Sequence, residues 1–347
     1  MRLVFLEGDM SRSGGTERMT AMLTNALSQN HVVSILELHG DGSSFFPLES
    51  SVKCLPLPKK HPRKAIRRFL QKNCVDFVVN VDTGMALFGI PASIGIKTKV
   101  ITWEHSNYYN NWGSKWFPYI RRFAARFSDA VVVLTKRDKQ NYEGNIVRCC
   151  QIITIGNPVE SPKVNYSIES KTILSAGHLS VIKRFDLIPE IGKLVFDRHP
   201  DWQWYICGEG PERQLLEEKI SQYGLEKNIV LTGSLKDMEK IYQSASMYVM
   251  TSEMEGLPMV LLEAKSYGLP IVSFDIMTGP SEIVRDSING YLVESGDIAA
   301  MAGRICELIE QPLLREQFSD AAALDMDKFE KEGIIAQWEK LFLELRK

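Results

Sequence analysis

The sequence is poor in cysteine, lacks a long apolar run and carries almost no net charge. Its six cysteines form no Cys-x-x-Cys or Cys-x-x-His pattern, which excludes the common zinc and dithiol motifs. No segment approaches the roughly 20 consecutive apolar residues of a membrane-spanning helix, and runs such as 130–134 have strand length. No signal-peptide pattern opens the chain. We therefore expect a reduced, cytoplasmic chain, with peripheral attachment to the inner face of the plasma membrane as the alternative.

The net charge of −2 hides an uneven distribution along the chain. Residues 1–160 contain 21 Lys and Arg against 13 Asp and Glu, whereas residues 161–347 contain 20 against 30. A basic half followed by an acidic half predicts that the first half meets an anionic partner.

Strand-length apolar runs alternate with helix-length amphipathic segments from end to end. Continuous Val- and Ile-rich strands are typical of parallel sheets covered on both faces, and 347 residues exceed one typical core. We therefore predict an α/β fold of two Rossmann-like doubly wound domains, 1–160 and 161–327, facing a central cleft. A polar linker is expected near 156–171, and a final helix within 328–347 is expected to join the first domain. The predicted strands are 2–8, 31–39, 75–82, 99–105, 129–135 and 151–157, then 172–179, 202–210, 228–234, 246–252, 270–275 and 290–295.

Two glycine-rich stretches follow predicted strands. Gly14 and Gly15 open a helix, where glycine lets the backbone approach a phosphate; the alternative is a turn that needs glycine only for its geometry. The second stretch contains Gly208 and Gly210, but Arg213 stands where a dinucleotide fingerprint has its third glycine. A nicotinamide-dependent oxidoreductase is therefore disfavoured.

A third candidate is Lys183, which follows the strand that ends near residue 179. A cation at the carboxyl end of a parallel sheet can neutralise a phosphate. The alternative is a solvated lysine at a helix start.

Glu255 and Glu263 lie eight positions apart across a Gly-Leu-Pro break, in the sequence SEMEGLPMVLLEA. Pro258 suits the first turn of a helix, which leaves the amides of Gly256, Leu257 and Met259 as anion acceptors. The two carboxylates would repel a phosphate, so they fit sugar or ribose hydroxyls instead. The alternative is that Glu255 favours the helix dipole and Glu263 is solvated.

In order, the stretches SGGTE, GHLSVIKRFDLI, GEGPERQLL, NIVLTGSLKD, SMYVMTSEMEGLPMVLLEAKSYGLPIV and NGYLVESGD resemble a retaining glycosyltransferase of the family-4 type. The resemblance covers nearly the whole chain and is strongest from about residue 173 to 297. It implies the GT-B arrangement of two Rossmann-like domains. It also implies transfer of a hexose or N-acetylhexosamine from a nucleoside diphosphate sugar, with UDP as the expected nucleotide and with retention of configuration.

The resemblance also implies roles for individual residues. Glu255 contacts the transferred sugar, Glu263 the ribose and Lys183 the donor phosphate, while the loop with Gly14 and Gly15 matches the family's glycine loop. Leu235 falls where the family holds the base by backbone contact. The expected catalytic residues are His105, Glu255 and Lys183, with a core or surface histidine as the alternative reading of His105. His178 replaces the family's usual arginine, so Arg184 is a candidate substitute cation.

No cofactor and no metal are expected. The only Asp-x-Asp pattern, Asp325 and Asp327, precedes the final helix, where capping explains it better than metal binding.

The expected acceptor is a saccharide, lipid-linked as in bacterial capsule, lipopolysaccharide or other surface-polysaccharide assembly; nucleic acid is not an expected partner. Segments 59–70 and 116–123 mix cations with apolar and aromatic residues, which suits an anionic membrane surface. The alternative is amphipathic helices that cover a sheet. The alternative function is a non-catalytic nucleotide-sugar-binding subunit of another glycosyltransferase.

Overall fold

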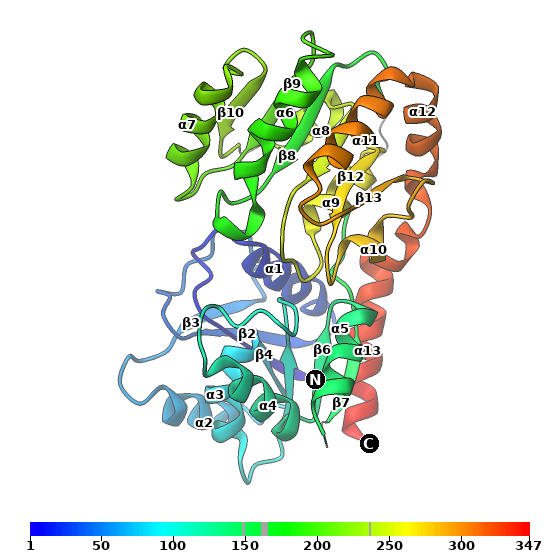
Figure 1. Cartoon of the computed structure of the whole chain (residues 1–347). Coiled ribbons are helices and arrows are strands. Elements are labelled where there is room, and N and C mark those ends of the chain that lie inside the picture. Colours follow the sequence, from blue (N-terminus) through cyan, green and yellow to red (C-terminus); the bar gives the residue numbers. More distant parts are fainter. Residues whose placement is uncertain (148–149, 161–165, 236) are drawn as a thin grey trace. The chain divides into compact units, whose positions relative to one another are not determined.

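The computed structural model describes residues 1–147, 150–160, 166–235 and 237–347. These residues form two compact units: Met1–Pro158 with Lys331–Lys347, the first unit, and Val159–Glu330, the second unit. Each unit is a parallel sheet covered by helices (Figure 1). The predicted fold class of two Rossmann-like doubly wound domains is confirmed. The predicted linker at 156–171 includes 161–165, which lie outside the described residues.

The sheet of the first unit has seven strands in the order β3-β2-β1-β4-β5-β6-β7. Every neighbouring pair is parallel, and the order reverses direction between β1 and β4. The strands are β1 (Arg2–Glu7), β2 (Val32–Glu37), β3 (Lys53–Pro56), β4 (Phe77–Val81), β5 (Lys99–Trp103), β6 (Ala130–Val133) and β7 (Gln151–Thr154).

Helices cover both faces of this sheet. On one face, Val4 and Leu6 of β1 pack with Ile66, Ile90 and Ala124 of three different helices. On the other face, the rings of Phe77 and Phe342 lie 5.0 Å apart, and those of Trp103 and Trp338 lie 5.2 Å apart. The helices of the unit are α1 (Gly15–Leu27), α2 (Pro62–Lys72), α3 (Ala86–Ser93), α4 (Phe117–Phe127), α5 (Lys136–Asn145) and α13 (Lys331–Arg346).

Two details of the first unit differ from the sequence prediction. Strand β3 was not predicted, because it has four residues, is only partly buried and ends in a proline, so it lacks an apolar run. The final helix begins at Lys331 and not at Lys328, since Met326–Phe329 forms a 3-10 turn before it.

The sheet of the second unit has six strands in the order β10-β9-β8-β11-β12-β13, again all parallel. All six were predicted, because each is a continuous apolar run bounded by glycine or polar residues. The order reverses between β8 and β11, which is where ligands bind in folds of this type. The strands are β8 (Thr172–Ala176), β9 (Gln203–Cys207), β10 (Ile229–Gly233), β11 (Met247–Met250), β12 (Ile271–Asp275) and β13 (Gly290–Glu294).

The second unit has seven α-helices among its described residues, and its core contains the fully buried Trp204, Tyr248 and Phe274. Throughout the described part of the chain, each helix is too short or too polar to cross a bilayer. The helices of the second unit are α6 (Ile188–Phe196), α7 (Arg213–Tyr223), α8 (Glu239–Ser244), α9 (Met259–Ser266), α10 (Pro280–Ile283), α11 (Ile298–Glu310) and α12 (Pro312–Asp320).

Candidate active site

Lys183 and Glu255 meet at the strand-order reversal of the second unit. Lys183 ends a 3-10 turn, Val181–Lys183, that follows β8, and Glu255 lies in the loop that follows β11. The Lys183 Nζ donates to Glu255 Oε1 at 2.6 Å, and both side chains are mostly buried. Because β8 and β11 are adjacent, two residues far apart in sequence become one cation-carboxylate pair.

Three further hydrogen bonds fix the loops that carry this pair. The Thr251 hydroxyl donates to the carbonyl of Lys183 at 3.0 Å, and the Glu253 amide donates to the carbonyl of Ile182 at 2.9 Å. The Thr278 hydroxyl donates to the carbonyl of Glu255 at 2.6 Å. The pair is thus held by backbone positions on both loops, which preorganises it for a ligand.

Helix α9 begins beside Glu255. Pro258 is its N-cap, one position earlier than a first-turn residue. Within the described residues, no protein acceptor contacts the amides of Gly256, Leu257 or Met259, so they resemble the open end of a helix that binds anions. Gly279 has a φ of 104°, and a side chain there would collide with Pro258. Glycine therefore lets the loop after β12 pack against this helix start.

Glu263 lies on α9, one turn beyond its start, and is held by a tyrosine. The buried Tyr242 hydroxyl donates to Glu263 Oε2 at 2.8 Å, and the Tyr242 ring stacks on Tyr267 at 5.1 Å. Burial, and then the charges of Glu263 and Glu255, raise the pKa of Tyr248 well above its ordinary value. The charges of both carboxylates therefore act on the same buried phenol.

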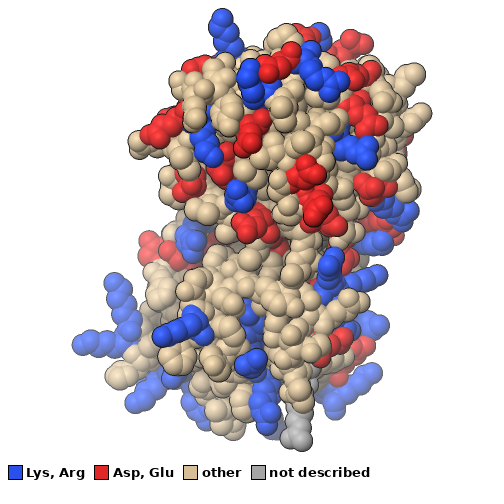
Figure 2. Space-filling model, in the orientation of Figure 1, with Lys and Arg blue, Asp and Glu red and all other residues tan. Residues whose placement is uncertain are grey.

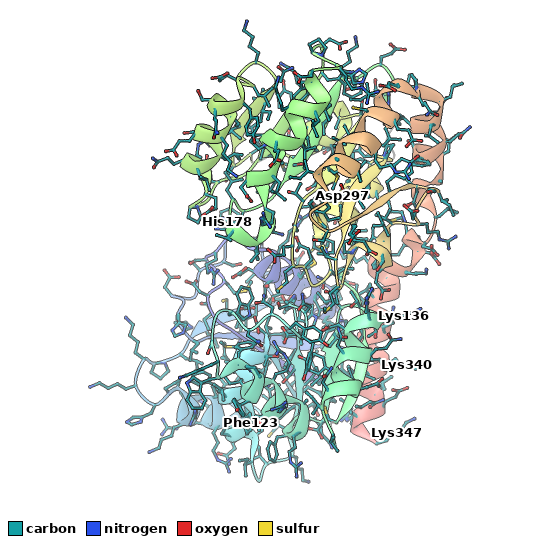
Figure 3. All side chains as sticks on the ribbon, in the orientation of Figure 1. Phe123, Lys136, His178, Asp297, Lys340 and Lys347 are labelled. Carbon is teal, nitrogen blue, oxygen red and sulfur yellow. The ribbon has the colours of Figure 1, made fainter. Side chains whose placement is uncertain are left out.

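The other predicted donor residues are less closely joined to this pair. His178 is exposed at the carboxyl end of β8 (Figure 3). Arg184, with a φ of 51°, directs its Nε to Asp186 at 3.0 Å and also pairs with Glu253 at 3.7 Å. Leu235 follows the edge strand β10, which β9 separates from β8. The structure thus pairs Lys183 with Glu255, places Glu263 on the helix that begins beside Glu255, and leaves Leu235 two strands away.

Gly208 and Gly210 pack two loops together. A side chain at Gly208 would overlap the carbonyl of Gly177, and one at Gly210 would overlap that of Leu179. The Leu179 amide also donates to the carbonyl of Glu209 at 2.9 Å. Glycine is required here because the loop after β9 crosses the loop after β8 without a gap, so the Gly-x-Gly pattern has a structural explanation that needs no dinucleotide.

In the first unit, Gly14 is the N-cap of α1, and the helix start already holds a carboxylate. A side chain at Gly14 would overlap the carboxylate of Glu17, which is 4% exposed. Burial raises the pKa of Glu17, and Arg12 lies 3.6 Å from it. Gly15 has open space around its Cα, so the backbone remains approachable there. A phosphate at this loop would meet Glu17, a feature that the sequence did not reveal.

His105 follows β5 and is enclosed by protein around its ring. The ring lies 4.1 Å from that of Trp103, and the Nε2 atom is buried without a hydrogen-bond partner among the described residues. Burial lowers the pKa of His105 to about 3, so the imidazole is neutral near pH 7. A buried ring nitrogen without a partner is rare and marks a position where a ligand would complete the hydrogen bonding.

Four acidic residues at the carboxyl edge of this sheet were not selected from the sequence; we call them the strand-end carboxyls. Burial raises the pKa of Glu7 to about 8, and burial followed by the charge of Glu104 raises that of Asp82 to about 7. Burial likewise raises the pKa of Asp138 to about 7. Glu104 accepts from Tyr142 at 3.0 Å and from the Thr83 hydroxyl. Glu7 ends its apolar strand and Asp82 and Glu104 directly follow theirs, a signal that the sequence did contain.

Asp325 does not cap the final helix, contrary to the expectation. Its carboxylate pairs with Arg285 at 2.5 Å and with Lys328 at 2.6 Å, and these partners lower its pKa. The local reason is the left-handed φ of 66° at Asp325, which directs the chain into a 3-10 turn before α13 begins.

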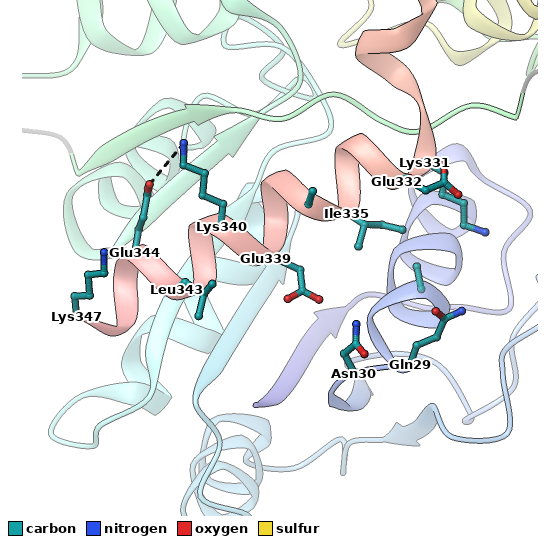
Figure 4. A pocket seen from close by; sticks show the side chains of 12 residues that line it. Gln29, Asn30, Lys331, Glu332, Ile335, Glu339, Lys340, Leu343, Glu344 and Lys347 are labelled. Carbon is teal, nitrogen blue, oxygen red and sulfur yellow. Dashed lines mark ion pairs between the residues drawn. The ribbon is translucent and has the colours of Figure 1, made fainter.

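A pocket of about 840 Å³ in the first unit contains none of the predicted site residues (Figure 4). It lies between the end of α1 and one side of α13, where His31 and Glu339 pair at 3.1 Å. Its lining mixes long polar side chains with alanine, isoleucine and leucine, so it is a groove between two helices and separate from the strand ends.

Two families match the chain in succession. The family described as Glycosyltransferase Family 4 matches residues 13–161, and the one described as Glycosyl transferases group 1 matches residues 159–325. An uncharacterized glycosyltransferase of Haemophilus influenzae is 30% identical over 97% of this chain and 98% of its own length. An alpha-1,4-N-acetyl-D-galactosaminyltransferase of Campylobacter jejuni, whose name includes a PP-undecaprenol acceptor, is 27% identical over 100% of this chain and 99% of its own.

Solved structures show the same fold. HepE of Anabaena, determined with UDP, superposes with a TM-score of 0.83 at 15% identity, covering 99% of this chain and 100% of that one. TarM of Staphylococcus aureus, determined with UDP, superposes with a TM-score of 0.71 at 25% identity. The match covers 81% of this chain and 59% of TarM, so TarM has a large part without a counterpart here.

Proposed function

Because the chain belongs to the group 1 and family 4 glycosyltransferases, we propose that it moves a hexose or N-acetylhexosamine from UDP to a saccharide hydroxyl with retention of configuration. The observation that carries this proposal is the Lys183–Glu255 pair beside the open start of α9. It combines a cation and helix amides for a diphosphate with carboxylates for hydroxyl groups.

The second unit supplies the donor site in this proposal. Lys183 and the amides of Gly256, Leu257 and Met259 bind the diphosphate, and Glu263, oriented by Tyr242, accepts hydrogen bonds from the ribose. UDP is the proposed nucleotide because TarM was determined with UDP. Leu235 and His178 are assigned to the base and the diphosphate by resemblance alone.

During transfer, the acceptor hydroxyl oxygen bonds to the anomeric carbon from the face that the diphosphate leaves. The bond between the anomeric carbon and the diphosphate oxygen breaks, its electron pair remains on the diphosphate, and the hydroxyl proton passes to the diphosphate. Lys183 and the amides at the start of α9 stabilise that charge, which is the largest electrostatic demand of the reaction. Glu255 positions the sugar through its hydroxyls. The neutral His105 is assigned to the sugar or acceptor by resemblance, since its Nε2 is enclosed by protein in this structure. No step requires a metal ion, and a metal at Asp325 would have to displace both Arg285 and Lys328.

We propose a lipid-linked saccharide as the acceptor and bacterial surface-polysaccharide assembly as the setting, at the cytoplasmic side of the membrane. Support comes from the Campylobacter relative, whose name specifies an undecaprenol-linked acceptor, and from the Erwinia amylovora relative named for amylovoran biosynthesis. The basic first unit suits an acceptor that carries a diphosphate.

A nucleotide-binding subunit without activity is the second candidate, favoured by His178 at the position where relatives hold an arginine. The intact set of Lys183, Glu255 and Glu263 argues for an enzyme. Slow hydrolysis of the bound donor distinguishes the two candidates, because only an enzyme would hydrolyse it.

The test is thermal unfolding of the whole chain with UDP, GDP, ADP and their sugars, followed by calorimetry of the best ligand. A nucleotide at 100 times its Kd stabilises the native state by about 2.7 kcal/mol, so UDP and its sugars are expected to raise the Tm by several degrees. Donor hydrolysis, measured with and without EDTA, then separates the two candidates. A folded chain that responds to no nucleotide contradicts the proposal, and activity lost in EDTA and restored by manganese contradicts metal independence.

A further inference from the structure

One stretch of the first unit carries charge of almost one sign. Residues 50–128 contain 14 Lys and Arg and only three acidic residues. Asp76 lies at the opposite edge of the sheet, at the start of β4, and accepts from the Arg2 amide at 2.7 Å. Asp82 and Glu104 are strand-end carboxyls that burial removes from the surface. Lys99, at the start of β5, pairs with Asp129 at 2.9 Å, so the excess of cations lies on the helices of this stretch and the turn before them.

The cations gather on one face because α2, α3 and α4 lie side by side over one side of the sheet. Arg67 of α2 donates to the carbonyl of Ile94 at 2.5 Å, and Arg63 lies 5.6 Å over the ring of Phe88 in α3. Ile66, Ile90 and Ala124 of the three helices share one core cluster. In Figure 2 the charged side chains over α2 and α4 are blue. The exposed cations of α2 and the turn before it are Lys59, Lys60, Arg63, Lys64, Arg68 and Lys72.

Large aromatic side chains are exposed on the same face. Trp112, Trp116, Tyr119 and Phe127 are 58%, 64%, 60% and 55% exposed. Cations accompany three of them: Lys115 over Trp116, Arg122 over Tyr119 and Arg126 over Phe127, each at 5.9 Å from the ring. Four of six tryptophans are at most 5% exposed, so both exposed tryptophans of the chain lie here. The ring of Phe123 in α4, which is labelled in Figure 3, lies 5.2 Å from that of Phe127.

The loop that presents the tryptophans is rigidly anchored. The buried Arg121 donates to the carbonyl of Asn110 at 2.6 Å and to Asn111 Oδ1 at 3.0 Å. Its guanidinium lies between the rings of Tyr108 and Phe117, at 5.1 and 5.2 Å. Arg121 thus fixes the start of the loop that carries the exposed tryptophans, and its charge also acts on the buried Asp82 and Asp138.

We propose that this basic-aromatic face, formed by α2, α3, α4 and residues 107–116, docks on an anionic lipid bilayer. Tryptophan and tyrosine prefer the headgroup level of a bilayer, and lysine and arginine bind anionic headgroups. A face that served solubility alone would not expose four large aromatic side chains between its cations. The proposal does not depend on sugar transfer, because it rests on surface chemistry of the first unit.

The test is flotation of the whole chain with vesicles of phosphatidylcholine alone or with about 25 mol% phosphatidylglycerol. Binding is expected only to the anionic vesicles and is expected to fall sharply at high salt, since exposed charges are screened. Lys64→Glu with Arg68→Glu is expected to lower the partition coefficient at least about 30-fold, because each cation near an anionic leaflet contributes a factor of roughly five. The matched control is Lys340→Glu, on α13 across the sheet, with Lys347→Glu, directly after that helix, and it is expected to keep binding within about threefold (Figure 3).

Tryptophan emission gives a second readout on the unmodified chain. Trp112 and Trp116 are expected to shift to shorter wavelength on anionic vesicles, and Trp112→Phe with Trp116→Phe abolishes the shift. Several outcomes would overturn the proposal. These are an equal loss of binding in the α13 control, equal binding to neutral vesicles, and no binding to any vesicle. Binding to duplex RNA as strong as that to anionic vesicles would also overturn it. Hydrogen exchange of peptides from the first unit shows whether the variants are folded. Nucleotide binding by the second unit, measured on the same samples, reports separately on the proposed function.

Discussion

The two units have the same strand order around their central strands and opposite charge. The first unit contains 25 Lys and Arg against 15 Asp and Glu, and the second contains 16 against 28. At the strand ends the contrast reverses: the basic unit encloses the strand-end carboxyls, and the acidic unit places a lysine, Lys183, at its centre. The fold therefore decides where functional groups lie, and individual residues decide their chemistry.

The two units also differ in how their buried carboxyl groups are neutralised. In the first unit, Glu7, Asp82 and Asp138 have pKa values raised to about 8, 7 and 7, because burial favours the protonated form. In the second unit, Glu255 is neutralised by a partner cation, which a ligand can replace. The first arrangement suits a site that stays closed to ions, and the second suits a site that exchanges them.

The largest expected effect comes from Glu255→Gln in the second unit. Loss of the carboxylate removes the proposed contact to the sugar, so transfer is expected to fall about 100-fold while UDP affinity stays within about threefold. Turnover and calorimetry measure the two quantities. The control is Glu253→Gln, in the same loop but 61% exposed, which is expected to change neither. An equal loss of turnover in the control would show that the loop, and not Glu255, is responsible.

The second prediction is that the stabilities of the two units depend on pH with opposite signs. The raised pKa values of Glu7, Asp82 and Asp138 mean that the native first unit binds more protons than the unfolded chain between about pH 4 and 8. Its stability therefore falls as pH rises through that window.

In the second unit, the buried Lys265 donates to the carbonyls of Ile283 and Leu324, and burial lowers its pKa to about 8. The unfolded chain then binds more protons between about pH 8 and 10.5, so the stability of the second unit rises with pH there. Hydrogen exchange of peptides from each unit, in the whole chain, measures both slopes. Asp138→Asn is expected to flatten the first slope by about one third, and equal slopes in both units would refute the contrast.

A smaller effect is expected from Tyr242→Phe, which removes the hydroxyl that orients Glu263. UDP affinity is expected to fall about tenfold, because a hydrogen bond to a charged group contributes about 1.5 kcal/mol. Calorimetry with UDP is the measurement. Tyr267→Phe keeps the stacking on Tyr242 and leaves the Tyr242 hydroxyl in place, so it is the matched control. Similar losses in both variants would assign the effect to the stack.

The smallest expected effect is that of His178→Arg, which introduces the arginine that the family resemblance implies at this position. Affinity for UDP is expected to stay the same or rise about threefold, since a guanidinium can pair bidentately with a diphosphate. Calorimetry of both proteins in parallel measures this change. A large loss would mean that position 178 does not face the diphosphate.

The strands of the second unit could be predicted because each is a continuous apolar run with a clear end. The same ends located Lys183 and Glu255, whose placement after β8 and β11 follows from the alternation of strands and helices. Strand β3 was missed because its four residues carry no apolar pattern. The carboxylate at the start of α1 was missed because Glu17 appears in the sequence as an ordinary first-turn acid.

The pairings within the site could not be predicted. Lys183 and Glu255 are 72 positions apart, and Tyr242 and Glu263 are 21 apart, so their contacts depend on strand order and on helix packing. The burial of the strand-end carboxyls could not be predicted either, because the sequence does not show that Asp82, Glu104 and Asp138 share one enclosed region. The family resemblance implied roles for the donor-site residues, but it did not indicate which side chain each of them contacts.

The Lys183–Glu255 pair has a consequence for selectivity against the small anions of a cell. A lysine that is already neutralised offers free phosphate little attraction, because the ion would have to displace a carboxylate at 2.6 Å. A ligand that brings both an anion for Lys183 and hydroxyl groups for Glu255 replaces both halves of the pair at once. Under the proposed function, we therefore expect the pair to bind a phosphate that carries a sugar more tightly than bare phosphate.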